Sequence, residues 1–570
     1  MEKSSYIVGI HQSGPIASAV ILKDGKLVAG SPEERFTRVK QDKAFPHKAL
    51  DFCLDYCKIS PENVDIFAIG WNAGENVAMK YRGGFSDWMR YPGEWLASVP
   101  NHLLPLFERG VKQANSSFDF DNGNKTNIIF VDHHACHAQA AYQISGFEEC
   151  ALMVTDGWSE QKVTSWIYAK NDKLETIRTK FFPESVGCLY AALTDFLGYR
   201  PFADEWKVMG MAAYGNKKVF APQMSKLVRI LKDGDYELDL SYFGFYNFDQ
   251  PKSYSEKMEK LFGSARKPNE QLLKKHYDIA AAGQEMFERV MENNLAFLSR
   301  QTGSKNLVLS GGTAMNCLFN GSVVQKTDFS RCSIGFAPDD SGNSIGAAFS
   351  AALQSGIKVQ APGQTAAIGK EYSSEKIGEL LEKYKIKSRR LKNRAAEAAD
   401  LLARNKVIGW FQGRSEFGQR ALGHRSIFAS PKNKEMKDKL NSMVKYREAY
   451  RPFAPMIPFE RLSEYFETRD SDQVRYMEKA FKFREQAIKK VPAVVHQDGT
   501  GRLQTVSRNE EPLLRELLDE FEERAGVPVL LNTSFNLNGE PIVNSPEDAL
   551  KTFFTSGIEA LFIEDYLIEK

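Results

Sequence analysis

Residues 151–179 read ALMVTDGWSEQKVTSWIYAKNDKLETIRT, and this stretch decides the fold of the first half of the chain. An apolar run ends in the turn Asp156-Gly157-Trp158, and two further runs are separated by the turn Asn171-Asp172-Lys173. Short runs rich in β-branched and aromatic residues that are bounded by such turns predict strands. We therefore expect a strand at 151–155, a polar loop, and a hairpin of strands at 163–169 and 174–179.

The same arrangement occurs near the N-terminus. Residues 6–10, 17–22 and 27–30 predict three strands, with the turn Lys23-Asp24-Gly25-Lys26 between the last two. Two copies of a strand, a loop and a hairpin, each followed by helices, resemble the actin, sugar-kinase and Hsp70-type (ASKHA) architecture, which holds a nucleotide between its paired halves. We therefore expect an α/β fold with a duplicated ASKHA-type domain.

A second domain is expected after a change in composition. Residues 361–374 are rich in Pro, Gly, Gln and Ser, and the duplicated pattern does not return after them. We place the boundary there, with a first domain at 1–362 and a second at 363–570. The second alternates predicted strands with helices, which is typical of a separate α/β domain. Its predicted strands are 407–411, 426–429 and 527–531, and its predicted helices include 394–404 and 511–525.

The bulk composition excludes several classes of protein. The 570 residues are 42% hydrophobic and 26% charged, and the mean hydropathy is −0.40, as in multidomain globular proteins. A net charge of +2 argues against a general nucleic-acid surface. Seven cysteines without CxxC pairs argue against a disulfide framework. Because neither a signal peptide nor a run of about eighteen apolar residues is present, we expect a cytoplasmic protein with no membrane partner.

Two histidines indicate a metal site. The tract VDHHACH at 131–137 places His133 and His137 four residues apart at a predicted strand-to-helix junction. An α-helix turns once in 3.6 residues, so both imidazoles project from one face, as two ligands of one ion do. Taken alone, this spacing more often reflects ordinary polar residues at a helix start.

Two carboxylates strengthen the metal hypothesis. Asp156 and Asp340 both follow apolar strands at corresponding loop positions. Each one alone is typical of a turn residue or a helix cap. Together with the two histidines they make a donor set for a divalent ion. These donors do not separate Fe²⁺, Zn²⁺ and Mn²⁺, so the identity of the metal stays open; Fe²⁺ is the ion that we favour.

Two further segments are candidates for binding anions. A strand at 306–309 opens into Gly311-Gly312, where a tight turn and a helix start can approach phosphate, although an ordinary strand-to-helix turn has the same pattern. The second segment, GRSEFGQRALGHRS at 413–426, is rich in arginine, whose paired N–H donors suit phosphate or carboxylate. Nearby candidates are Lys445, Arg451, Arg502 and the loop 532–536. Solvated surface charge and RNA binding are the alternatives, but RNA needs a broader basic face.

With these motifs assembled, the chain resembles the NodU/CmcH family of carbamoyltransferases over nearly its whole length. The matching segments are EERFTR (33–38), HHACHA (133–138), KVMGMA (207–212), GGTAMN (311–316), DSG (340–342), the arginine-rich segment 413–426, RPFAP (451–455) and NTSFN (532–536). In that family the N-terminal part resembles the metal- and ATP-binding domain of tRNA threonylcarbamoyladenosine synthesis, and the C-terminal part resembles the YrdC-like domain.

The resemblance implies a reaction. Carbamoyl phosphate is cleaved in the YrdC-like domain, the carbamate attacks ATP to give carbamoyladenylate and pyrophosphate, and an acceptor hydroxyl then takes the carbamoyl group at the metal site. It also implies residue roles. The metal ligands are His133, His137, Asp156 and Asp340; the nucleotide lies near Lys207, Gly311, Gly312 and Asn316; and carbamoyl phosphate is held by Arg414, Arg420, Lys445, Arg451, Arg502, Asn532 and Ser534. Of these, Arg420, Lys445 and Arg451 are the expected catalytic residues, and Mg²⁺ is a further candidate ion.

One departure from the family concerns the general base. Family members carry His-Asp-Ala-Ser-Ala after the first strand, and that His is the expected base for the acceptor. The aligned tract here is Pro15-Ile16-Ala17-Ser18-Ala19. His11, four residues upstream, is a candidate substitute, and an incidental polar residue is the alternative. An amine acceptor, which needs less deprotonation, would also explain the difference.

The expected acceptor is a small secondary metabolite, such as an antibiotic, or a sugar, and the aromatic stretch 71–106 is a candidate for shaping its pocket. Two other functions compete with this one. The first is a tRNA threonylcarbamoyladenosine-type enzyme, against which the lack of an extended basic surface argues. The second is a metal- and nucleotide-binding regulator without turnover. Relatives suggest a homodimer.

Overall fold

The computed structural model describes residues 4–12, 14–72, 113–246, 251–360, 363, 365–446, 450–468 and 473–570. The chain forms two compact units. The first consists of Met1–Val28, Lys43–Asn316 and Val323–Ala361. The second consists of Ala29–Asp42, Cys317–Ser322 and Pro362–Lys570. Two short stretches that precede residue 363 therefore pack with the second unit. None of the described helices is long and apolar enough to cross a bilayer.

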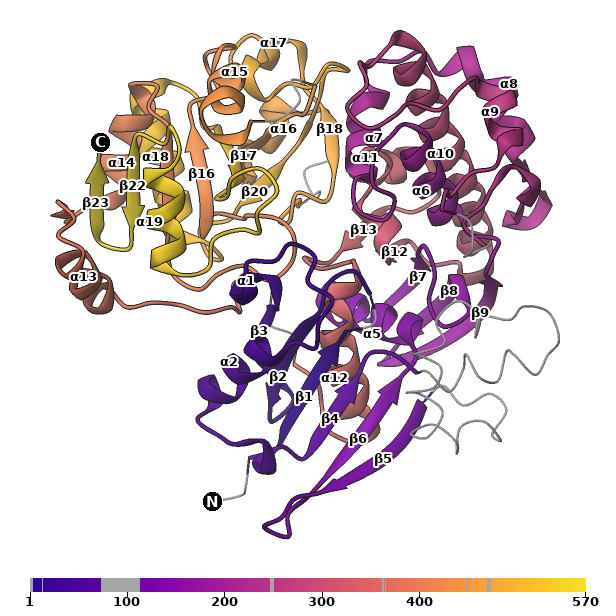
Figure 1. The fold of residues 1–570 in the computed structure, drawn as a ribbon, viewed down its shortest axis with the longest axis horizontal. Coiled ribbons are helices and arrows are strands. Elements are labelled where there is room, and N and C mark those ends of the chain that lie inside the picture. Colours follow the sequence, from indigo (N-terminus) through magenta and orange to yellow (C-terminus); the bar gives the residue numbers. More distant parts are fainter. Residues whose placement is uncertain are drawn as a thin grey trace. The chain divides into compact units, whose positions relative to one another are not determined.

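The first unit contains a six-stranded sheet in the order β3-β2-β1-β4-β6-β5 (Figure 1). Strand β1 pairs antiparallel with β2 and parallel with β4, and β4 pairs parallel with β6. The strands are β1 (Tyr6–His11), β2 (Ser18–Lys23), β3 (Lys26–Pro32), β4 (Ile66–Ile69), β5 (Gln113–Asp119) and β6 (Lys125–Val131).

A five-stranded sheet of the first unit repeats this topology. Its order is β9-β8-β7-β12-β13 read from the hairpin side, which matches β3-β2-β1-β4-β6 strand for strand. Strand β7 pairs antiparallel with β8 and parallel with β12, and β12 pairs parallel with β13. The strands are β7 (Glu149–Thr155), β8 (Lys162–Lys170), β9 (Lys173–Phe181), β12 (Asn306–Ser310) and β13 (Arg331–Ile334). The internal duplication is confirmed, and the first unit has the predicted ASKHA-type fold.

Two helices bring the duplicated halves together. Helix α5 (His133–Ser145) follows β6, and α12 (Asn343–Gln354) follows β13. A Cβ on Gly346 of α12 would collide with the carbonyl oxygen of Cys136 in α5, and a Cβ on Gly9 of β1 would collide with the carbonyl oxygen of Ser344. Because glycine has no Cβ, the backbones approach closely. The N-terminus of α12 is thereby held beside α5 and β1.

The remaining helices of the first unit form the outer layers. Helix α10 packs against α7 and α8, while α2 packs against β2. They are α2 (His47–Cys57), α6 (Val186–Phe196), α7 (Glu205–Ala212), α8 (Lys217–Leu227), α9 (Glu256–Phe262) and α10 (Lys274–Thr302), with a small hairpin of β10 (Val228–Ile230) and β11 (Tyr236–Leu238). Helix α11 (Cys317–Lys326) begins in the second unit and continues in the first.

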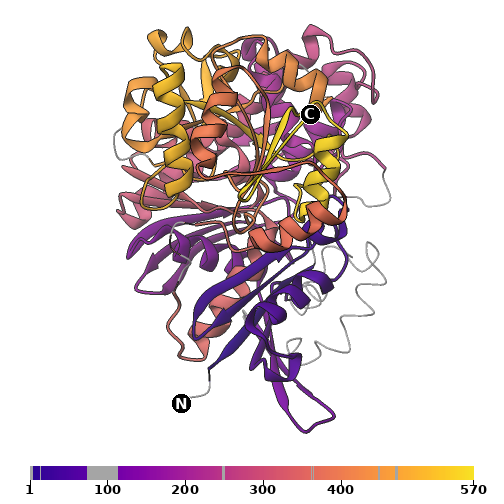
Figure 2. The same ribbon diagram turned by 90° about the vertical axis from the view of Figure 1, so that its left-hand side faces the viewer.

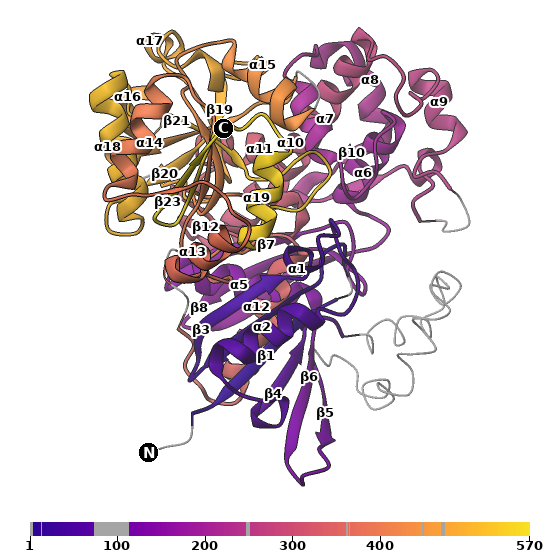
Figure 3. The same ribbon diagram turned by 60° about the vertical axis from the view of Figure 1, so that its left-hand side comes forward.

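The second unit is built on an eight-stranded mixed sheet in the order β14-β23-β22-β15-β16-β21-β17-β20. Figures 2 and 3 show α14 (Arg394–Ala403) and α18 (Pro512–Ala525) side by side on one face of this sheet, with α19 (Pro546–Phe554) on the other. Its strands are β14 (Arg389–Arg390), β15 (Ile408–Phe411), β16 (Arg425–Ala429), β17 (Ala454–Pro458), β20 (Gln504–Val506), β21 (Leu530–Ser534), β22 (Ala560–Ile563) and β23 (Tyr566–Glu569), and a hairpin of β18 (Ala480–Lys482) and β19 (Thr500–Arg502) stands apart.

The helices of the second unit lie close to their predicted positions. Helix α14 is Arg394–Ala403 and α18 is Pro512–Ala525. The predicted strand at 527–531 begins only at Leu530, and Pro528 explains this because it has no N–H to donate to a sheet. The other helices are α1 (Glu34–Thr37), α13 (Ser374–Lys383), α15 (Met436–Leu440), α16 (Leu462–Tyr465), α17 (Glu485–Ile488) and α19 (Pro546–Phe554).

The stretch Ala29–Asp42 is anchored in the second unit by two arginines. Arg35 is buried and donates to the carbonyl oxygen of Gly418 at 2.6 Å. Arg38 donates to the carbonyl oxygens of Ile542 (2.5 Å) and Pro541 (2.9 Å). Guanidinium groups have five N–H donors, so two such residues fix a short helix firmly. The EERFTR segment thus has a structural role in this unit.

Candidate metal centre

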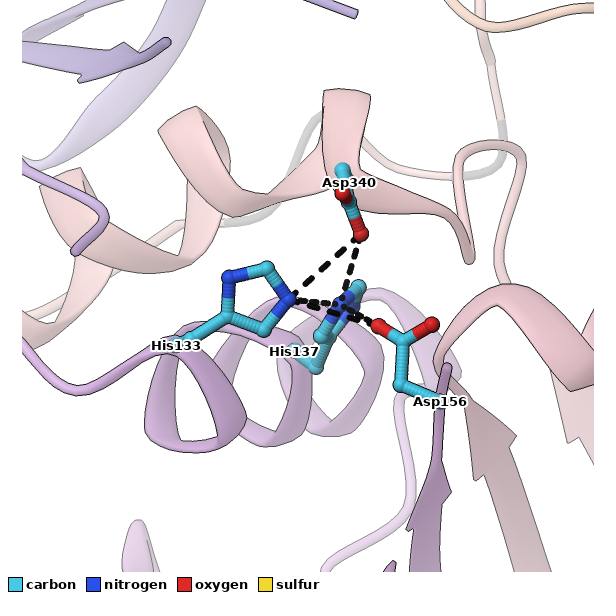
Figure 4. A group of neighbouring side chains, drawn as sticks. All are labelled: His133, His137, Asp156 and Asp340. Carbon is cyan, nitrogen blue, oxygen red and sulfur yellow. Dashed lines mark hydrogen bonds and ion pairs between the residues drawn. The ribbon is translucent and has the colours of Figure 1, made fainter. Parts of the chain in front are cut away.

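Four side chains of the first unit converge on one point (Figure 4). The Nε2 atoms of His133 and His137 lie 3.1 Å apart. Oδ2 of Asp156 lies 3.3 Å from the first and 3.1 Å from the second. Oδ1 of Asp340 lies 3.4 and 3.5 Å from the same two nitrogens. The four predicted metal ligands are therefore neighbours, with all donor atoms within 4.8 Å of one another.

Three of the four donors lie just beyond a strand. His133 is the first residue of α5, and Asp132, between β6 and this helix, caps the helix by accepting from the N–H of Ala135 at 2.8 Å. Asp156 follows β7 directly. Asp340 opens a short 3₁₀ turn between β13 and α12. The helical spacing of four residues places His137 one turn beyond His133 and on the same face.

The donor set fits a divalent cation. Two imidazole nitrogens and two carboxylate oxygens, all of them atoms that can bind a cation through a lone pair, face one another in a largely buried place. Burial lowers the pKa of His133, but Asp340 and Asp156 outweigh it and raise that pKa well above its ordinary value. The carboxylates likewise raise the pKa of His137 against the effect of burial. Two imidazoles with two carboxylates match Fe²⁺, Zn²⁺ or Mn²⁺.

His11 adjoins this cluster. Its side chain is fully buried, and its Nδ1–H donates to the carbonyl oxygen of Gly70 at 3.3 Å. This bond leaves the lone pair on Nε2, which lies 4.0 Å from Oδ2 of Asp340. Burial is the main cause that lowers the pKa of His11 to about 4. The ring is therefore neutral at pH 7 and able to accept a proton at Nε2.

Gly14 makes room for this arrangement. A Cβ at this position would collide with Oδ2 of Asp340 and would lie 2.8 Å from Nε2 of His11. No side chain fits here unless one of those two groups moves. The imidazole of His11 thus lies next to the cluster and close to Gly14.

Sequence patterns did not reveal two further polar residues of the site. Glu160 accepts from the backbone N–H groups of His133 (3.0 Å) and Asn72 (2.8 Å) and so fixes the start of α5. The side-chain amide of Asn343 lies with its Nδ2 atom 3.2 Å from Nε2 of His133 and 3.3 Å from Nε2 of His137. Neither stands at a periodic position. The only signal for Asn343 was its place three residues after Asp340.

Only some of the predicted nucleotide-binding residues have a described contact with the metal cluster. Gly311 has a φ of +88°, and a Cβ there would collide with the carbonyl oxygen of Thr155, so the turn requires glycine. The N–H of Gly312 donates to Oδ1 of Asp156 at 3.2 Å, which joins this loop to the metal cluster. The position of glycine at 311 is therefore explained by a close backbone approach.

The other two nucleotide candidates contact protein groups. Asn316 and Gln284 exchange hydrogen bonds through their amides at 2.9 and 3.0 Å. The Nζ of Lys207 lies 3.2 Å from Asp204 and over the ring of Tyr199.

The predicted carbamoyl phosphate residues lie in the second unit. The Nζ of Lys445 contacts the carbonyl oxygens of Ser534 (2.5 Å) and Asn536 (3.0 Å). Arg414 donates to the carbonyl oxygens of Gly369 and Ile368. Lys445 is thus bonded to the loop 532–536, and Arg414 is bonded to the backbone near the start of the second unit.

Three more of the predicted carbamoyl phosphate residues lie near Cys317 or Gln504: Arg420 and Arg502 near the first, and Asn532 near the second. Arg420 and Arg502 are both close enough to influence the thiol of Cys317 electrostatically. Asn532 donates through Nδ2 to Gln504 at 2.8 Å and to the carbonyl oxygen of Ala421 at 3.2 Å. Arg451 begins the segment leading into β17. Of the aromatic stretch 71–106, only Trp71 and Asn72 belong to the described residues, and the rest lies outside them.

The first unit thus combines a duplicated α/β fold with a His-and-Asp cluster, and comparisons with known proteins identify its family. The family model for the carbamoyltransferase N-terminus matches residues 7–349, and the model for the carbamoyltransferase C-terminus matches residues 399–570. The chain belongs to this carbamoyltransferase family and is a carbamoyltransferase enzyme.

Nodulation proteins are among its relatives. Nodulation protein NolNO of Sinorhizobium fredii is 34% identical over 97% of this chain and 78% of its own length. Nodulation protein U of Bradyrhizobium diazoefficiens is 35% identical over 94% of this chain and 92% of its own length. Among solved structures, HypF of T. kodakarensis is 13% identical with a TM-score of 0.31, and the match covers 62% of this chain and 48% of that one.

Proposed function

We propose that the protein is an ATP-dependent enzyme that carbamoylates a hydroxyl group, or an amine, of a small metabolite or sugar. Carbamoyl phosphate and ATP are its co-substrates, and carbamoyladenylate is the intermediate. The observation that carries the proposal is the bond between Gly312 N–H and Asp156, because it joins the phosphate-type loop to the metal cluster. The phosphate group of the nucleotide and the carbonyl group of the carbamoyl moiety are then bound at one site in the first unit.

In the first unit, the metal ion is held by His133, His137, Asp156 and Asp340. When bound, the ion supplies Lewis-acid polarisation of the carbamoyl carbonyl. His11 accepts the proton of the attacking hydroxyl at Nε2, which is the unprotonated ring nitrogen because Nδ1 donates to Gly70. Gly311, Gly312, Asn316 and Lys207 bind the nucleotide.

In the second unit, fixed positive charge serves the formation of the adenylate. Arg420, Lys445 and Arg451 stabilise negative charge on the transferring groups, where preorganised donors are most effective. Arg414, Arg502, Asn532 and Ser534 complete the carbamoyl phosphate site. We also place the enzyme in the cytoplasm and expect a homodimer, on the strength of the sequence and its relatives.

Pyrophosphate release tests the overall proposal. The purified full chain is incubated with carbamoyl phosphate, ATP and Fe²⁺ under anaerobic conditions, with Mg²⁺ present. Release that depends on carbamoyl phosphate supports the enzyme. Nucleotide binding without release would instead indicate the regulator. A screen of alcohols, amines and tRNA as acceptors then separates small-molecule transfer from tRNA modification.

The role of His11 has a separate test. His11→Ala is expected to abolish carbamoyl transfer while leaving carbamoyl phosphate-dependent pyrophosphate release intact, because only the acceptor needs the base. His276→Ala is the matched control, since His276 is also a buried histidine of the first unit. Its Nδ1 accepts a hydrogen bond from the backbone N–H of Leu273 at the start of α10. Unchanged product formation in His11→Ala rejects the role of base.

A further inference from the structure

We propose that His496 is a positioning residue for Arg502: its ring nitrogen Nε2 holds the backbone N–H of Arg502, and with it the arginine that the proposed function assigns to carbamoyl phosphate. The inference rests on that proposed function and adds a residue to it. His496 belongs to none of the motifs described above. It lies in the second unit, in the turn between a short 3₁₀ helix (Pro492–Val494) and β19.

Arg502 is the last residue of β19, which pairs with β18. The next backbone N–H, that of Leu503, donates to the carbonyl oxygen of Lys479 on the β18 side. Because neighbouring backbone groups along an antiparallel strand point alternately to its two edges, the N–H of Arg502 points away from β18. The guanidinium of Arg502 acts electrostatically on the thiol of Cys317, as that of Arg420 does. The two predicted ligand-binding arginines therefore lie near the same place.

His496 contacts the outer edge of β19 twice. Its backbone N–H donates to the carbonyl oxygen of Thr500 at 2.8 Å, and its Nε2 accepts from the N–H of Arg502 at 3.4 Å. These two outward groups are the ones that a further strand would pair with. Strands β18 and β19 form a two-stranded sheet, so the imidazole takes the place of a strand carbonyl along this stretch of the edge.

The hydrogen bonds of the ring have a defined direction, which is set by Asp498. A carboxylate only accepts, so the hydroxyl of Thr500 donates to Oδ1 of Asp498 at 2.7 Å. Because that hydroxyl has one hydrogen, it accepts from Nδ1 of His496, which lies 3.1 Å away. With a hydrogen on Nδ1, a neutral imidazole has its lone pair on Nε2. The contacts with Thr500 and Asp498 thus select the tautomer that can hold the N–H of Arg502.

The charge state of the ring agrees with this role. Burial is the main cause that lowers the pKa of His496 to about 4; Asp498 opposes this effect, while Arg502 and Lys437 add to it. The ring is therefore neutral at pH 7. A protonated ring would have a second N–H in place of the lone pair and would repel the N–H of Arg502.

A fixed backbone at Arg502 affects ligand binding because the guanidinium stands at the end of a long side chain. Without the Nε2 contact the end of β19 is less restrained, so the guanidinium is less well placed for the ligand. A hydrogen bond of ordinary net strength corresponds to a factor of about 3 to 10 in an equilibrium constant. The proposed function assigns Arg502 to binding carbamoyl phosphate, so the effect is expected in affinity rather than in turnover at saturation.

The test compares His496→Gln with His496→Asn in the full chain. The amide of Gln reaches about as far from the backbone as Nε2, whereas the amide of Asn ends near the position of Nδ1. His496→Asn is therefore expected to raise the dissociation constant of carbamoyl phosphate, measured by calorimetry without ATP, about 3- to 10-fold, and His496→Gln to raise it less. In the pyrophosphate assay the KM for carbamoyl phosphate should follow this order, while kcat changes little.

Gln497→Ala is the matched control, because Gln497 is the next residue of the same turn and is exposed. It should bind carbamoyl phosphate as the wild type does, and melting curves check the folding of every variant. Equal losses in the two His496 variants overturn the inference, since a ring needed only for packing does not distinguish the two amides. No loss in His496→Asn overturns it as well.

Arg502→Ala separates this inference from the proposed function. If Arg502→Ala weakens carbamoyl phosphate binding and His496→Asn does not, the inference alone fails. If Arg502→Ala binds carbamoyl phosphate as tightly as the wild type, the assignment of Arg502 to this ligand is wrong, and the inference falls with that part of the proposed function.

Discussion

The metal cluster of the first unit and the arginine-rich segment 413–426 of the second unit are both dense in charged groups, but they use them differently. In the cluster, one atom each of His133, His137, Asp156 and Asp340 lies within 4.8 Å of the others, in a group that could hold a metal ion. In the arginine-rich segment, Arg414 and Arg425 instead donate hydrogen bonds to backbone carbonyl oxygens. The comparison shows that charge density in a motif does not distinguish a ligand site from a structural scaffold.

Arg425 illustrates the scaffold. It is fully buried, donates to the carbonyl oxygens of Gln412, Lys370 and Gly413 at 3.0 to 3.1 Å, and lies over the ring of Phe411. Glu416 complements it by accepting from backbone N–H groups of the same segment. These side chains hold the loop between β15 and β16, so the motif supplies a framework for its own loop.

Among the substitutions, Asp340→Asn is expected to have the largest effect on the metal cluster. Removing one carboxylate leaves the two imidazoles with a single anionic partner, and a divalent ion loses both charge and geometry. We expect the Mn²⁺ dissociation constant to rise at least about 100-fold and carbamoyl transfer to be lost. Calorimetry and product assays measure both. Asp195→Asn is the control, since that carboxylate bonds the N–H of Ser253 instead.

Gly14→Ala perturbs the cluster without removing a donor. The added methyl must displace Asp340 or His11, and both contacts are ends of side chains, so the fold is expected to remain intact. A displacement of about 1 Å reduces transfer about 100-fold, with little change in melting temperature. Gly335→Ala, whose Cβ would meet Ile144 at an ordinary 3.6 Å, should keep full activity. Equal activity in the two variants would contradict the tight packing at Gly14.

Arg425→Met tests the scaffold. The substitution leaves buried carbonyl oxygens and Glu416 without their cationic partner, so the free energy of unfolding is expected to fall by about 3 kcal/mol. Urea unfolding of the full chain measures the change. Arg389→Met removes only an exposed pair with Glu397, and its effect should be below about 1 kcal/mol. A small effect at Arg425 would assign it to ligand binding instead.

Glu416→Gln is expected to have the smallest effect on the free energy of unfolding, and the size of this effect depends on pH. Burial raises the pKa of Glu416, but His424, backbone N–H groups and Arg425 together lower it below its ordinary value. Because the folded pKa is the lower one, the carboxylate stabilises the fold above the unfolded pKa of about 4.3, and this stability is lost as the pH falls through the folded pKa. The difference in unfolding free energy between wild type and variant should therefore shrink in acid. A constant difference across this range would contradict it.

Local periodicity made much of this protein predictable. The alternation of apolar runs and turns located the duplicated strands, because strand and turn conformations depend mainly on neighbouring residues. The helical repeat placed His133 and His137 on one face for the same reason. Aspartates at strand ends completed a donor set whose members the structure brings within 4.8 Å.

The sequence by itself therefore determined the elements, the duplication and the chemical kinds of the four donors. Only the tertiary structure decided that the amide of Asn343 lies beside the ring of His133, 210 residues earlier in the chain, and that residues 29–42 pack into the second unit. It also decided that Lys445 and Arg414 contact backbone carbonyls. The physical reason is that close packing, such as that of α12 on α5 at Gly346, depends on side-chain volumes far apart in the chain and leaves no periodic trace in the sequence.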